Sequence, residues 1–577
     1  MNNVFLREKK SLELDNHASF VEYLRWMRSP SPTLEDNHDN DTKAILLQEA
    51  VGKSRNYQQY FQARNDATEL IADNTFDVKC TWRVRVGGMR GPEDMLLPAF
   101  DAAGMPYIPA SSLRGVARAW GLRETSEAEV ESCLGSLEAP KKDRAGKVIF
   151  LDAYPLAKTW GQQEGGLAID IANSIWKWEQ SELTYKPNPN LFLSLKKTTF
   201  LVGLRRTRRC DDRTFDLVKS WLIQGLQVGI GAQVNSGYGE MQIKGYTPPK
   251  PFLQVSFTLT GQLIHSYQHL TWDRQRQRYN RETEAEVRSP ALKSMLHYWF
   301  RALALGVLDC EEVRVRLEPE LFGAIEPQTR GAIKCRVEEV KSPKPRRQEQ
   351  NDRQCLSQQG RLQLSFSEGI ATEKEDAVRE LFCNLTWLAF HLGGVGQGAR
   401  RPKHKRNSKP YYRGCQLRAT LVRSQEWDWP DLPDELPQFK VLFQEKLQNF
   451  YDALARFLGR SLSPHNPRSP AGKFREFVGN DCKIVVCRDD GDFDTSDENK
   501  PLALRILHRL AHRGNHKYDR ELCGDAKSNP SPVLIADLGL YQVVTVFGAG
   551  ANRRREYLRE LKDNVDHYLQ LWPFNGP

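Results

Sequence analysis

Residues 111–120 read SSLRGVARAW, and a related run, PALKSMLHYW, occupies residues 290–299. Each run is followed further along the chain by a glycine-rich loop, GIGAQVNSGYG at residues 229–239 and GGVGQGARR at residues 393–401. A leucine, a basic residue, a second basic or histidine residue and a tryptophan fall at matching places in the two runs. Because the same pair of elements recurs in the same order, the sequence predicts two related domains on one chain, each built to hold a polyanion.

The two runs have the spacing of amphipathic helices. In the first run, apolar residues from Leu113 to Trp120 fall at i, i+3, i+4 and i+7 and predict a buried stripe. We expect Ser111 or Ser112 to cap this helix. In the second run, Ser289 is the expected cap and the proline after it takes the first helical position.

A second face of each predicted helix is basic. Arg114 and Arg118 lie one turn apart, and Lys293, His297 and Arg301 recur every four residues. Such faces are suited to phosphate groups of a nucleic acid. The alternative is an ordinary solvated helix face.

The glycine loops favour anion binding as well. Glycine permits positive φ and close backbone approach, so that successive amides point into one concavity. In the first loop Asn235, Ser236 and Tyr238 add donors, and the ring of Tyr238 is also suited to stacking on a base. The second loop runs into a cationic segment, residues 400–413. An ordinary helix end followed by a turn is the alternative.

Composition limits the class of protein. The 577 residues include 83 Lys and Arg against 73 Asp and Glu, and the net charge of +10 favours polyanionic partners. The sequence shows no membrane-spanning apolar run and no signal-peptide pattern. Eleven scattered cysteines without a Cys-x-x-Cys pair predict a reducing, cytoplasmic location. We therefore expect no membrane partner.

Metal and cofactor sites are not predicted. His508, His512 and His516 are four residues apart, with Cys523 nearby, but interleaved arginines favour a basic, RNA-facing or solvated segment over a metal site. Neither a nucleotide-binding fingerprint nor a Ser/His/Asp or Cys/His arrangement is found. The sequence argues for binding rather than catalysis.

Changes in periodicity divide the chain. Residues 1–75 read as a helical lead-in, and strict alternation from Val78 to Val86 predicts a half-buried strand. The proline-rich stretch 248–253 predicts a linker between a domain at 76–247 and a module at 254–577. Strands and helices interleave in each part, which predicts an α+β fold.

At this point the motifs resemble those of the RAMP superfamily of CRISPR-associated proteins. IPASSLRG at 108–115, GKVIFLDA at 146–153 and the first glycine loop resemble the sixth subunit of the type III-B Cmr effector complex. SPALKSMLHYWFRAL at 289–303, LFG at 321–323, the second glycine loop and SPV at 531–533 resemble the first Cmr subunit. Gln233 and His297 stand where these families carry a lysine and an arginine.

The resemblance implies tandem ferredoxin-like (RRM-like) domains, with two such subdomains in the second module. It implies a non-catalytic, RNA-binding capping subunit, without cofactor, that contacts the 3′ region of the crRNA and the adjoining target RNA. Its protein partners would be other type III subunits, namely backbone RAMP subunits and the small helical subunit. The residues expected to contact RNA are Ser111, Ser112, Arg114, Arg118, Gly229, Gly231, Gln233, Asn235, Ser236, Tyr238, Lys293, His297, Arg301, Gly393, Gly394, Gly396, Gln397, Arg400, Arg401, Lys403, Lys405 and Arg406.

Two other functions remain open. Backbone-cleaving members of the superfamily use an aspartate in the loop after the first strand, where Asp94 lies here, so a metal-dependent endoribonuclease is one alternative. The other is a structural adaptor that contacts only neighbouring protein subunits.

Overall fold

The computed structural model divides the chain into two compact units. Unit 1 comprises residues 1–172, 189–249 and 266–284, and unit 2 comprises residues 173–188, 250–265 and 285–577. The structure describes residues 39–87, 96–138, 144–161, 165–179, 182–246, 250–273, 275, 278–341, 356–368, 370–395, 400–406, 411–424, 427–468, 474–488, 500–512, 519–525 and 529–574.

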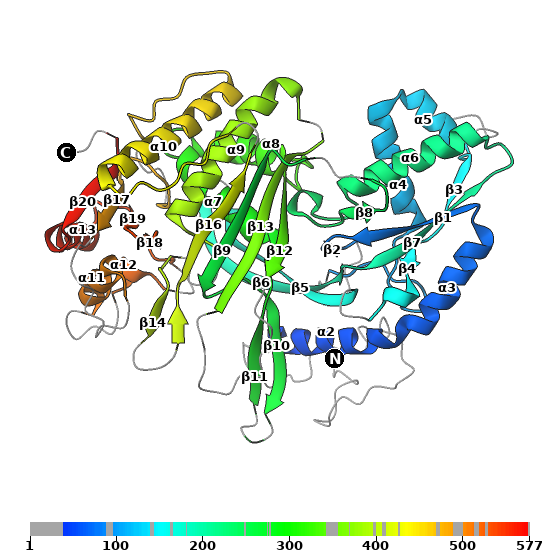
Figure 1. Cartoon of the computed structure of the whole chain (residues 1–577), viewed down its shortest axis with the longest axis horizontal. Coiled ribbons are helices and arrows are strands. Elements are labelled where there is room, and N and C mark those ends of the chain that lie inside the picture. Colours follow the sequence, from blue (N-terminus) through cyan, green and yellow to red (C-terminus); the bar gives the residue numbers. More distant parts are fainter. Residues whose placement is uncertain are drawn as a thin grey trace. The chain divides into compact units, whose positions relative to one another are not determined.

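Unit 1 is built on a β-α-β-β-α-β series (Figure 1). The six elements are β1 (Asn74–Cys80), α4 (Ala110–Glu124), β3 (Val148–Phe150), β7 (Thr199–Arg206), α6 (Asp212–Val228) and β8 (Met241–Ile243). These four strands lie in a five-stranded antiparallel sheet in the order β3-β7-β1-β8, with β4 (Tyr154–Pro155) also paired to β7. The second strand of the series is thus at one end of this order and the fourth at the other. α4 packs against α6, and α3 (Gln58–Ile71) contacts the sheet through β7.

Shorter elements and a second sheet complete unit 1. β2 (Arg83–Val84) pairs with the long hairpin strands in the order β2-β6-β5. The remaining elements are α2 (Asp39–Ser54), the 3-10 turns η1 (Arg55–Tyr57), η3 (Ala157–Thr159) and η4 (Val234–Ser236), α5 (Glu127–Leu134), β4 (Tyr154–Pro155), β5 (Gly166–Glu179) and β6 (Glu182–Lys196).

Unit 2 contains the same series twice. The first copy is β9 (Leu253–Gly261), α7 (Ser289–Ala304), β12 (Ile333–Lys341), β13 (Leu356–Phe366), α9 (Thr372–Leu392) and β16 (Cys415–Arg423). The second copy is β17 (Cys482–Arg488), α11 (Leu502–Ala511), β18 (Val533–Asp537), β19 (Gln542–Phe547), α13 (Asn552–Asn564) and β20 (His567–Trp572). Their antiparallel sheets have the orders β12-β13-β9-β16 and β18-β19-β17-β20, which repeat the order of unit 1.

The other elements of unit 2 lie within these copies, except for α10, which lies between them in sequence. They are the π-helical turn η5 (Glu312–Leu317), α8 (Glu318–Phe322), β14 (His404–Arg406), β15 (Tyr411–Arg413), α10 (Leu436–Leu458) and α12 (Arg520–Cys523). In each of the first two series, a glycine loop joins the second helix to the fourth strand. The repeated motif of the sequence therefore has the same topological place in both.

Two β-hairpins contain residues that belong to the unit formed mainly by the other half of the chain. The end of the β5–β6 hairpin, residues 173–188, belongs to unit 2, where Leu183 is buried in the core and Trp176 meets Phe474 edge to face at 5.2 Å. The hairpin of β10 (His265–Asp273) and β11 (Arg278–Ala285) lies mainly in unit 1, where the Gln48 amide exchanges two hydrogen bonds with the backbone of Leu270. Each half of the chain thus supplies a hairpin to the other unit.

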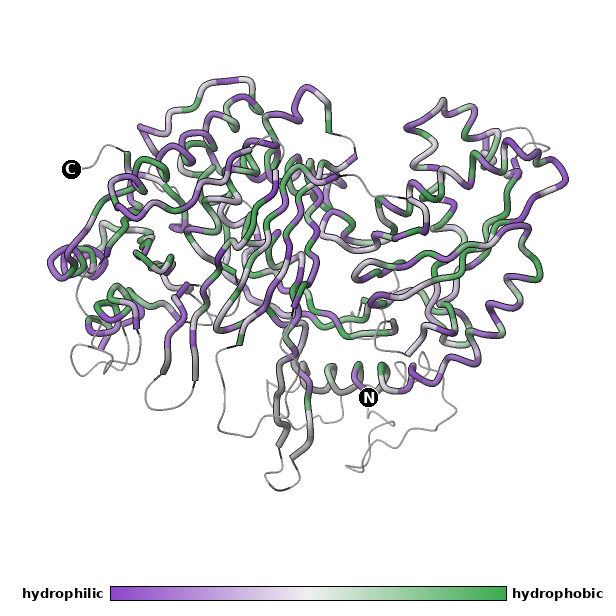
Figure 2. Tube along the Cα trace, viewed as in Figure 1, coloured by the Kyte–Doolittle hydropathy of each residue, from purple (hydrophilic) through white to green (hydrophobic). Residues whose placement is uncertain are grey.

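Hydrophobic residues alternate with hydrophilic ones along the elements of both units (Figure 2). One cluster fills unit 1 and two fill unit 2, and strand β9 buries every second residue. The predicted helices at 111–120, 217–226, 290–303, 381–392, 440–458 and 502–512 are confirmed, as are the strands near 148–151, 199–204, 255–259, 484–486 and 543–547. The α+β fold class is confirmed. In the described part of the chain, no helix is long and apolar enough to cross a membrane.

Three local expectations were wrong. The alternation from Val78 to Val86 is split between β1 and β2, because the chain turns after Cys80 to pair with a different sheet. Ser111 and Ser112 do not cap α4, whose first amide, Ala110 N, donates to Asp152 Oδ1 at 2.8 Å. Ser289 lies inside α7, and its hydroxyl accepts from Val337 N at 2.9 Å.

Candidate nucleic-acid interface

The first glycine loop follows the end of α6 directly. Gly229, Gly231, Gly237 and Gly239 all have positive φ, and Gln233 has φ +59°, which is uncommon for a side chain-bearing residue. A Cβ added to Gly231 would lie 2.3 Å from the carbonyl oxygen of Arg85. The loop therefore requires glycine where it passes against β2, as the sequence predicted.

Some backbone amides of the loop donate hydrogen bonds to the segment of β2, and others do not. Ala232 N donates to Arg85 O at 3.0 Å, and Gly239 N donates to Arg83 O at 2.7 Å. Within the described residues, the amides of Gly231, Gln233 and Val234 have no hydrogen-bond acceptor. The left-handed Gln233 followed by the helical turn at Val234 is the kind of backbone that gathers amides around an anion.

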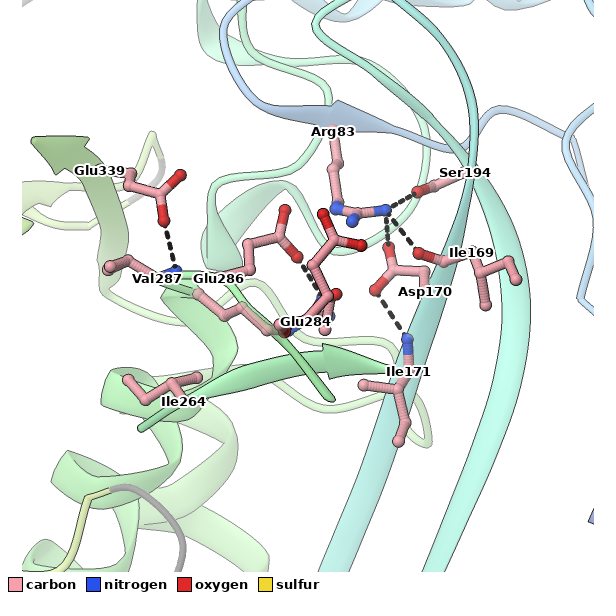
Figure 3. A network of polar contacts seen from close by, with 12 residues as sticks. Arg83, Ile169, Asp170, Ile171, Ser194, Ile264, Glu284, Glu286, Val287 and Glu339 are labelled. Carbon is pink, nitrogen blue, oxygen red and sulfur yellow. Dashed lines mark hydrogen bonds and ion pairs between the residues drawn. The ribbon is translucent and has the colours of Figure 1, made fainter. Parts of the chain in front are cut away.

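A buried ionic network in unit 1 contacts this loop, and Figure 3 shows its members Arg83, Asp170, Ser194 and Ile169. Tyr238 OH donates to Asp170 Oδ2 at 2.9 Å, and Arg83 lies 3.5 Å from the same oxygen. Arg83 Nη1 also donates to Ser194 Oγ at 2.8 Å and to Ile169 O at 3.0 Å. Because Arg83 and Asp170 are almost fully buried, each charge depends on the other and on these hydrogen bonds.

The role expected for the Tyr238 ring needs correction. Tyr238 is only 2% exposed, and its ring meets Trp82 edge to face at 4.9 Å. A ring enclosed in this way presents no open face to a base. Tyr238 supports the loop, while Asn235 and Ser236 remain partly exposed.

The basic face of α4 is open to solvent. Ser111 and Arg114 are exposed, and Ser112 is half-buried. Arg118 lies 3.4 Å from Glu127 and 3.6 Å from Glu131, so its charge is partly offset by α5. Arg114 thus provides the stronger attraction for a phosphate.

The basic face of α7 turns inward instead. Lys293 Nζ donates to Phe322 O at 3.0 Å, and His297 stacks on the Phe322 ring at 4.3 Å. Arg301 binds both carboxylate oxygens of Glu318. All three side chains thus contact α8, which leaves Lys293 and His297 half-buried and Arg301 buried.

The pKa values of the charged residues that contact α8 are shifted. Burial favours the protonated form of Glu318, but His297 and Arg301 outweigh it and lower the pKa of Glu318 to about 2. Burial lowers the pKa of Lys293 to about 8. The exchanged hairpin also closes this site, because Trp178 Nε1 donates to Glu318 Oε2 at 3.0 Å and its ring lies under Arg301 at 5.5 Å.

The second glycine loop is described only at its ends. Gly393 and Gly394 have positive φ, and Gly393 O accepts from Trp299 Nε1 at 2.6 Å. Gly396 and Gln397 lie outside the described residues, as do the side chains of Lys405 and Arg406 in β14.

Two arginines of this loop are structural anchors. Arg400 pairs with Glu476 at 2.7 Å, and Arg401 donates to Ser531 Oγ at 2.7 Å and to a backbone carbonyl of β18. Lys403 is half-buried. The loop therefore exposes fewer of its positive charges to solvent than its sequence suggests.

Asp94, the candidate catalytic aspartate, lies outside the described residues. Among the residues that the structure does describe, no group of three or more His, Cys, Asp or Glu side chains is placed to hold a metal ion.

Residues 75–242 match the model of the RAMP superfamily. A match to a curated protein is more specific than this family match. The CRISPR system CMR subunit Cmr6 of Saccharolobus solfataricus is 23% identical over an alignment of 278 residues that covers 42% of this chain and 91% of that protein.

Solved structures give similar matches. A chain in the cryo-EM structure of the type III-B Cmr-beta bound to cognate target RNA is 23% identical, with 37% of this chain and 77% of that chain covered and a TM-score of 0.28. The crystal structure of Cmr6 from Pyrococcus furiosus is 20% identical, with 30% and 97% covered and a TM-score of 0.20. TM-scores this low establish no shared architecture for the whole chain.

Four supporting residues were not singled out from the sequence. Asp152, which accepts from the first amide of α4, lies in the GKVIFLDA motif at 146–153, so the sequence did mark its region. Asp170, Glu318 and Trp178 had none, because their partners lie far away in sequence.

Proposed function

We propose that this chain is an RNA-binding capping subunit of a crRNA-guided type III CRISPR effector complex. The match of residues 75–242 to the RAMP superfamily and the Cmr6 relative support an effector subunit. In this proposal the subunit contacts the 3′ region of the crRNA and the adjoining target RNA. Its partners are the backbone RAMP subunits and the small helical subunit, and it works in the cytoplasm without a cofactor.

One observation carries the RNA-binding part of the proposal. The first glycine loop exposes Gly231 and Gln233, whose amides have no acceptor among the described residues, in a backbone suited to anions. Arg114 adds a solvent-exposed cation on α4, which packs against the helix that leads into this loop. Base pairing between guide and target would carry sequence specificity, while the protein holds the backbone.

The domain assignment belongs to the same proposal. Three β-α-β-β-α-β series with one common strand order support ferredoxin-like domains, one in the region 76–247 and two in the region 254–577. Residues 1–75 would be the lead-in and residues 248–253 the linker. We infer that the second module corresponds to the first Cmr subunit, as its motifs suggest.

Arg114→Ala tests the exposed helix face. We expect weaker binding of single-stranded RNA by a similar factor for all sequences, and a salt dependence flatter by roughly 0.7 for the lost contact. Arg118→Ala is the matched control, because Glu127 and Glu131 already offset its charge. Equal losses for the two variants, or a loss confined to one RNA sequence, would contradict the assignment.

The endoribonuclease alternative has its own test. The purified effector complex is incubated with target RNA and Mg²⁺, with the wild-type chain or with Asp94→Ala. The capping proposal predicts identical products, and the loss of one cleavage band in the variant would favour the enzyme. RNA crosslinks to neither half of the chain would favour the protein-only adaptor.

A further inference from the structure

A small cavity lies in unit 2 beside β16, an edge strand of its sheet. The side chains that matter for a ligand come from the end of α9, from β16 and from the segment before α10, and they are Phe390, His391, Arg418, Ala419, Trp429 and Asp431. The volume of the cavity is about 140 Å³, which is the size that accepts a single aromatic ring. All of these residues belong to unit 2, so the cavity lies within one compact unit.

Aromatic rings form one wall of the cavity. Trp429 meets Phe390 edge to face, with the ring centroids 5.7 Å apart, and the centroid of the His391 ring is 6.2 Å from that of Trp429. Trp427 packs against Trp429 from outside the cavity wall at 5.7 Å. Phe390 is buried, whereas Trp429 is only half-buried. Trp429 therefore offers aromatic surface to a flat ligand.

His391 is a polar group in this wall. It is only 6% exposed, and its Nδ1 lies 2.6 Å from Trp387 O in the preceding helical turn. A carbonyl oxygen can only accept, so Nδ1 carries the proton and Nε2 is an acceptor. Burial lowers the pKa of His391 to about 4, so the ring is neutral at pH 7. Among the residues that the structure describes, Nε2 has no hydrogen-bond partner, and a ligand in the cavity can supply the donor.

Two charged side chains of the wall are exposed to solvent, Asp431 and Arg418. The guanidinium of Arg418 lies over the turn that follows β18, because a Cβ added to Gly539 would be 2.6 Å from Arg418 Nη2. A carboxylate accepts hydrogen bonds and a guanidinium donates them. The cavity thus offers a ligand two acceptors, His391 Nε2 and the Asp431 carboxylate, and the donors of Arg418.

Among the flat rings of a nucleic acid, cytosine matches this set of groups. Its exocyclic amine carries two hydrogens for the two acceptors, and its ring nitrogen and carbonyl oxygen accept from a guanidinium. Uracil has a single N–H on its pairing edge, and a purine adds a second ring to a cavity that has the size of one. An apolar side chain of a partner protein would leave the buried acceptor of His391 without a donor.

We propose that this cavity holds one unpaired cytosine of the bound RNA, against Trp429, with the amine of the base donating to His391 Nε2 and Asp431 and with Arg418 donating to the base. This inference rests on the proposed RNA-binding function. It adds a site that reads one base to a subunit whose other proposed contacts hold the RNA backbone.

The test compares the affinities for three RNA sequences. The full chain is titrated at neutral pH with fluorescent single-stranded decamers of cytidine, uridine and adenosine. We expect the wild type to bind the cytidine decamer about tenfold more tightly than the other two, as hydrogen bonds to the base predict. Ala419→Leu fills the cavity and should abolish this preference. Thr420→Leu adds the larger side chain at the neighbouring, exposed position and should keep it.

A second variant guards against a folding defect of Ala419→Leu. Arg418 is exposed, so Arg418→Ala should fold normally and bind the cytidine decamer about fivefold more weakly. Arg423→Ala is its control, because Arg423 is exposed on the same strand and does not line the cavity. Equal wild-type affinities for the three decamers, an unchanged preference in a folded Ala419→Leu, or an unchanged affinity for the cytidine decamer in Arg418→Ala overturns the inference.

Two further outcomes separate this inference from the proposed function. RNA binding that is sensitive to Arg114→Ala but not to Ala419→Leu would leave the proposed function intact and overturn the inference alone. Cytidine monophosphate that raises the melting temperature of a chain that binds none of the decamers would make the ligand a free nucleotide, and would overturn the inference together with the proposed function. If Ala419→Leu binds RNA like the wild type but no longer assembles with other effector subunits, the cavity holds a protein side chain and the inference is overturned.

Discussion

Tyr238→Phe separates a supporting role of this residue from a stacking role. The substitution keeps the aromatic ring and removes the hydroxyl that donates to Asp170 Oδ2 at 2.9 Å. Arg83 lies 3.5 Å from the same oxygen. A hydrogen bond to a buried charge contributes about 1.5–3 kcal/mol, so we expect a loss of about 2 kcal/mol in the unfolding free energy of unit 1.

The assay is differential scanning calorimetry of the full chain. For a unit of about 250 residues, a loss of this size lowers the melting temperature by roughly 4–8 °C. RNA affinity should fall as well, because the network holds the strand and loop together. Tyr246→Phe is the matched control, since Tyr246 is 47% exposed.

The opposing account makes a different prediction. If Tyr238 acted by stacking on a base, phenylalanine would preserve RNA affinity and Tyr238→Ala alone would reduce it. Unchanged stability and unchanged affinity in Tyr238→Phe would refute the supporting role.

Three further predictions concern the site under α8. Glu318→Gln leaves Arg301 buried without a counter-charge and should destabilise unit 2 by about 3–5 kcal/mol at pH 7. The folded-state pKa of Glu318 is about 2 against an ordinary 4.5, so the stabilisation by Glu318 is complete above pH 4.5 and is lost as the pH falls towards 2. Thermal scans of the variant should therefore lack the loss of stability that the wild type shows between these pH values. Lys293→Met should stabilise unit 2 by about 1–2 kcal/mol in urea unfolding at pH 7. The pKa of Lys293 is lowered to about 8, so its buried charge destabilises the folded state until the pH rises towards 10.5. A variant less stable than the wild type would contradict this prediction. Trp178→Ala should lower the melting temperature of unit 2, whereas Ile175→Ala, at an exposed position of the same hairpin, should not, and equal effects would show that the Trp178–Glu318 contact is unimportant.

Local patterns in the sequence predicted most elements of the fold. The spacing of Leu292, Met295 and Trp299 identified the buried side of α7, and all three are buried. Alternation identified β9 in the same way. Such periodicities need no knowledge of distant partners, which is why they were reliable.

The basic face of α7 could not be predicted correctly from spacing alone. Lys293, His297 and Arg301 have the same spacing as an exposed cationic face, and only their contacts with Glu318 and Phe322 of α8 show that they are partly or fully covered. Arg400 is a second case, because Glu476 is far from it in sequence. A helical pattern identifies which residues share a face, but the neighbour that covers the face is set by tertiary packing.

The supporting network of the first loop had the same limitation. Gly231 could be assigned from sequence, since its positive φ is a local requirement. Asp170, Arg83 and Tyr238 lie in three separate segments of the sequence, and no local sequence pattern links these segments. For Tyr238, burial decided between a stacking role and a supporting role.

The central claim is that the first glycine loop holds guide RNA. Its most direct test is ultraviolet crosslinking in the native host, followed by sequencing of the RNA attached to peptides from residues 229–239. We predict RNA of CRISPR-repeat sequence, and a large reduction in Gly231→Ala, whose added Cβ would lie 2.3 Å from Arg85 O. Absence of RNA on this loop in the wild type, or equal crosslinking in the variant, would contradict the account.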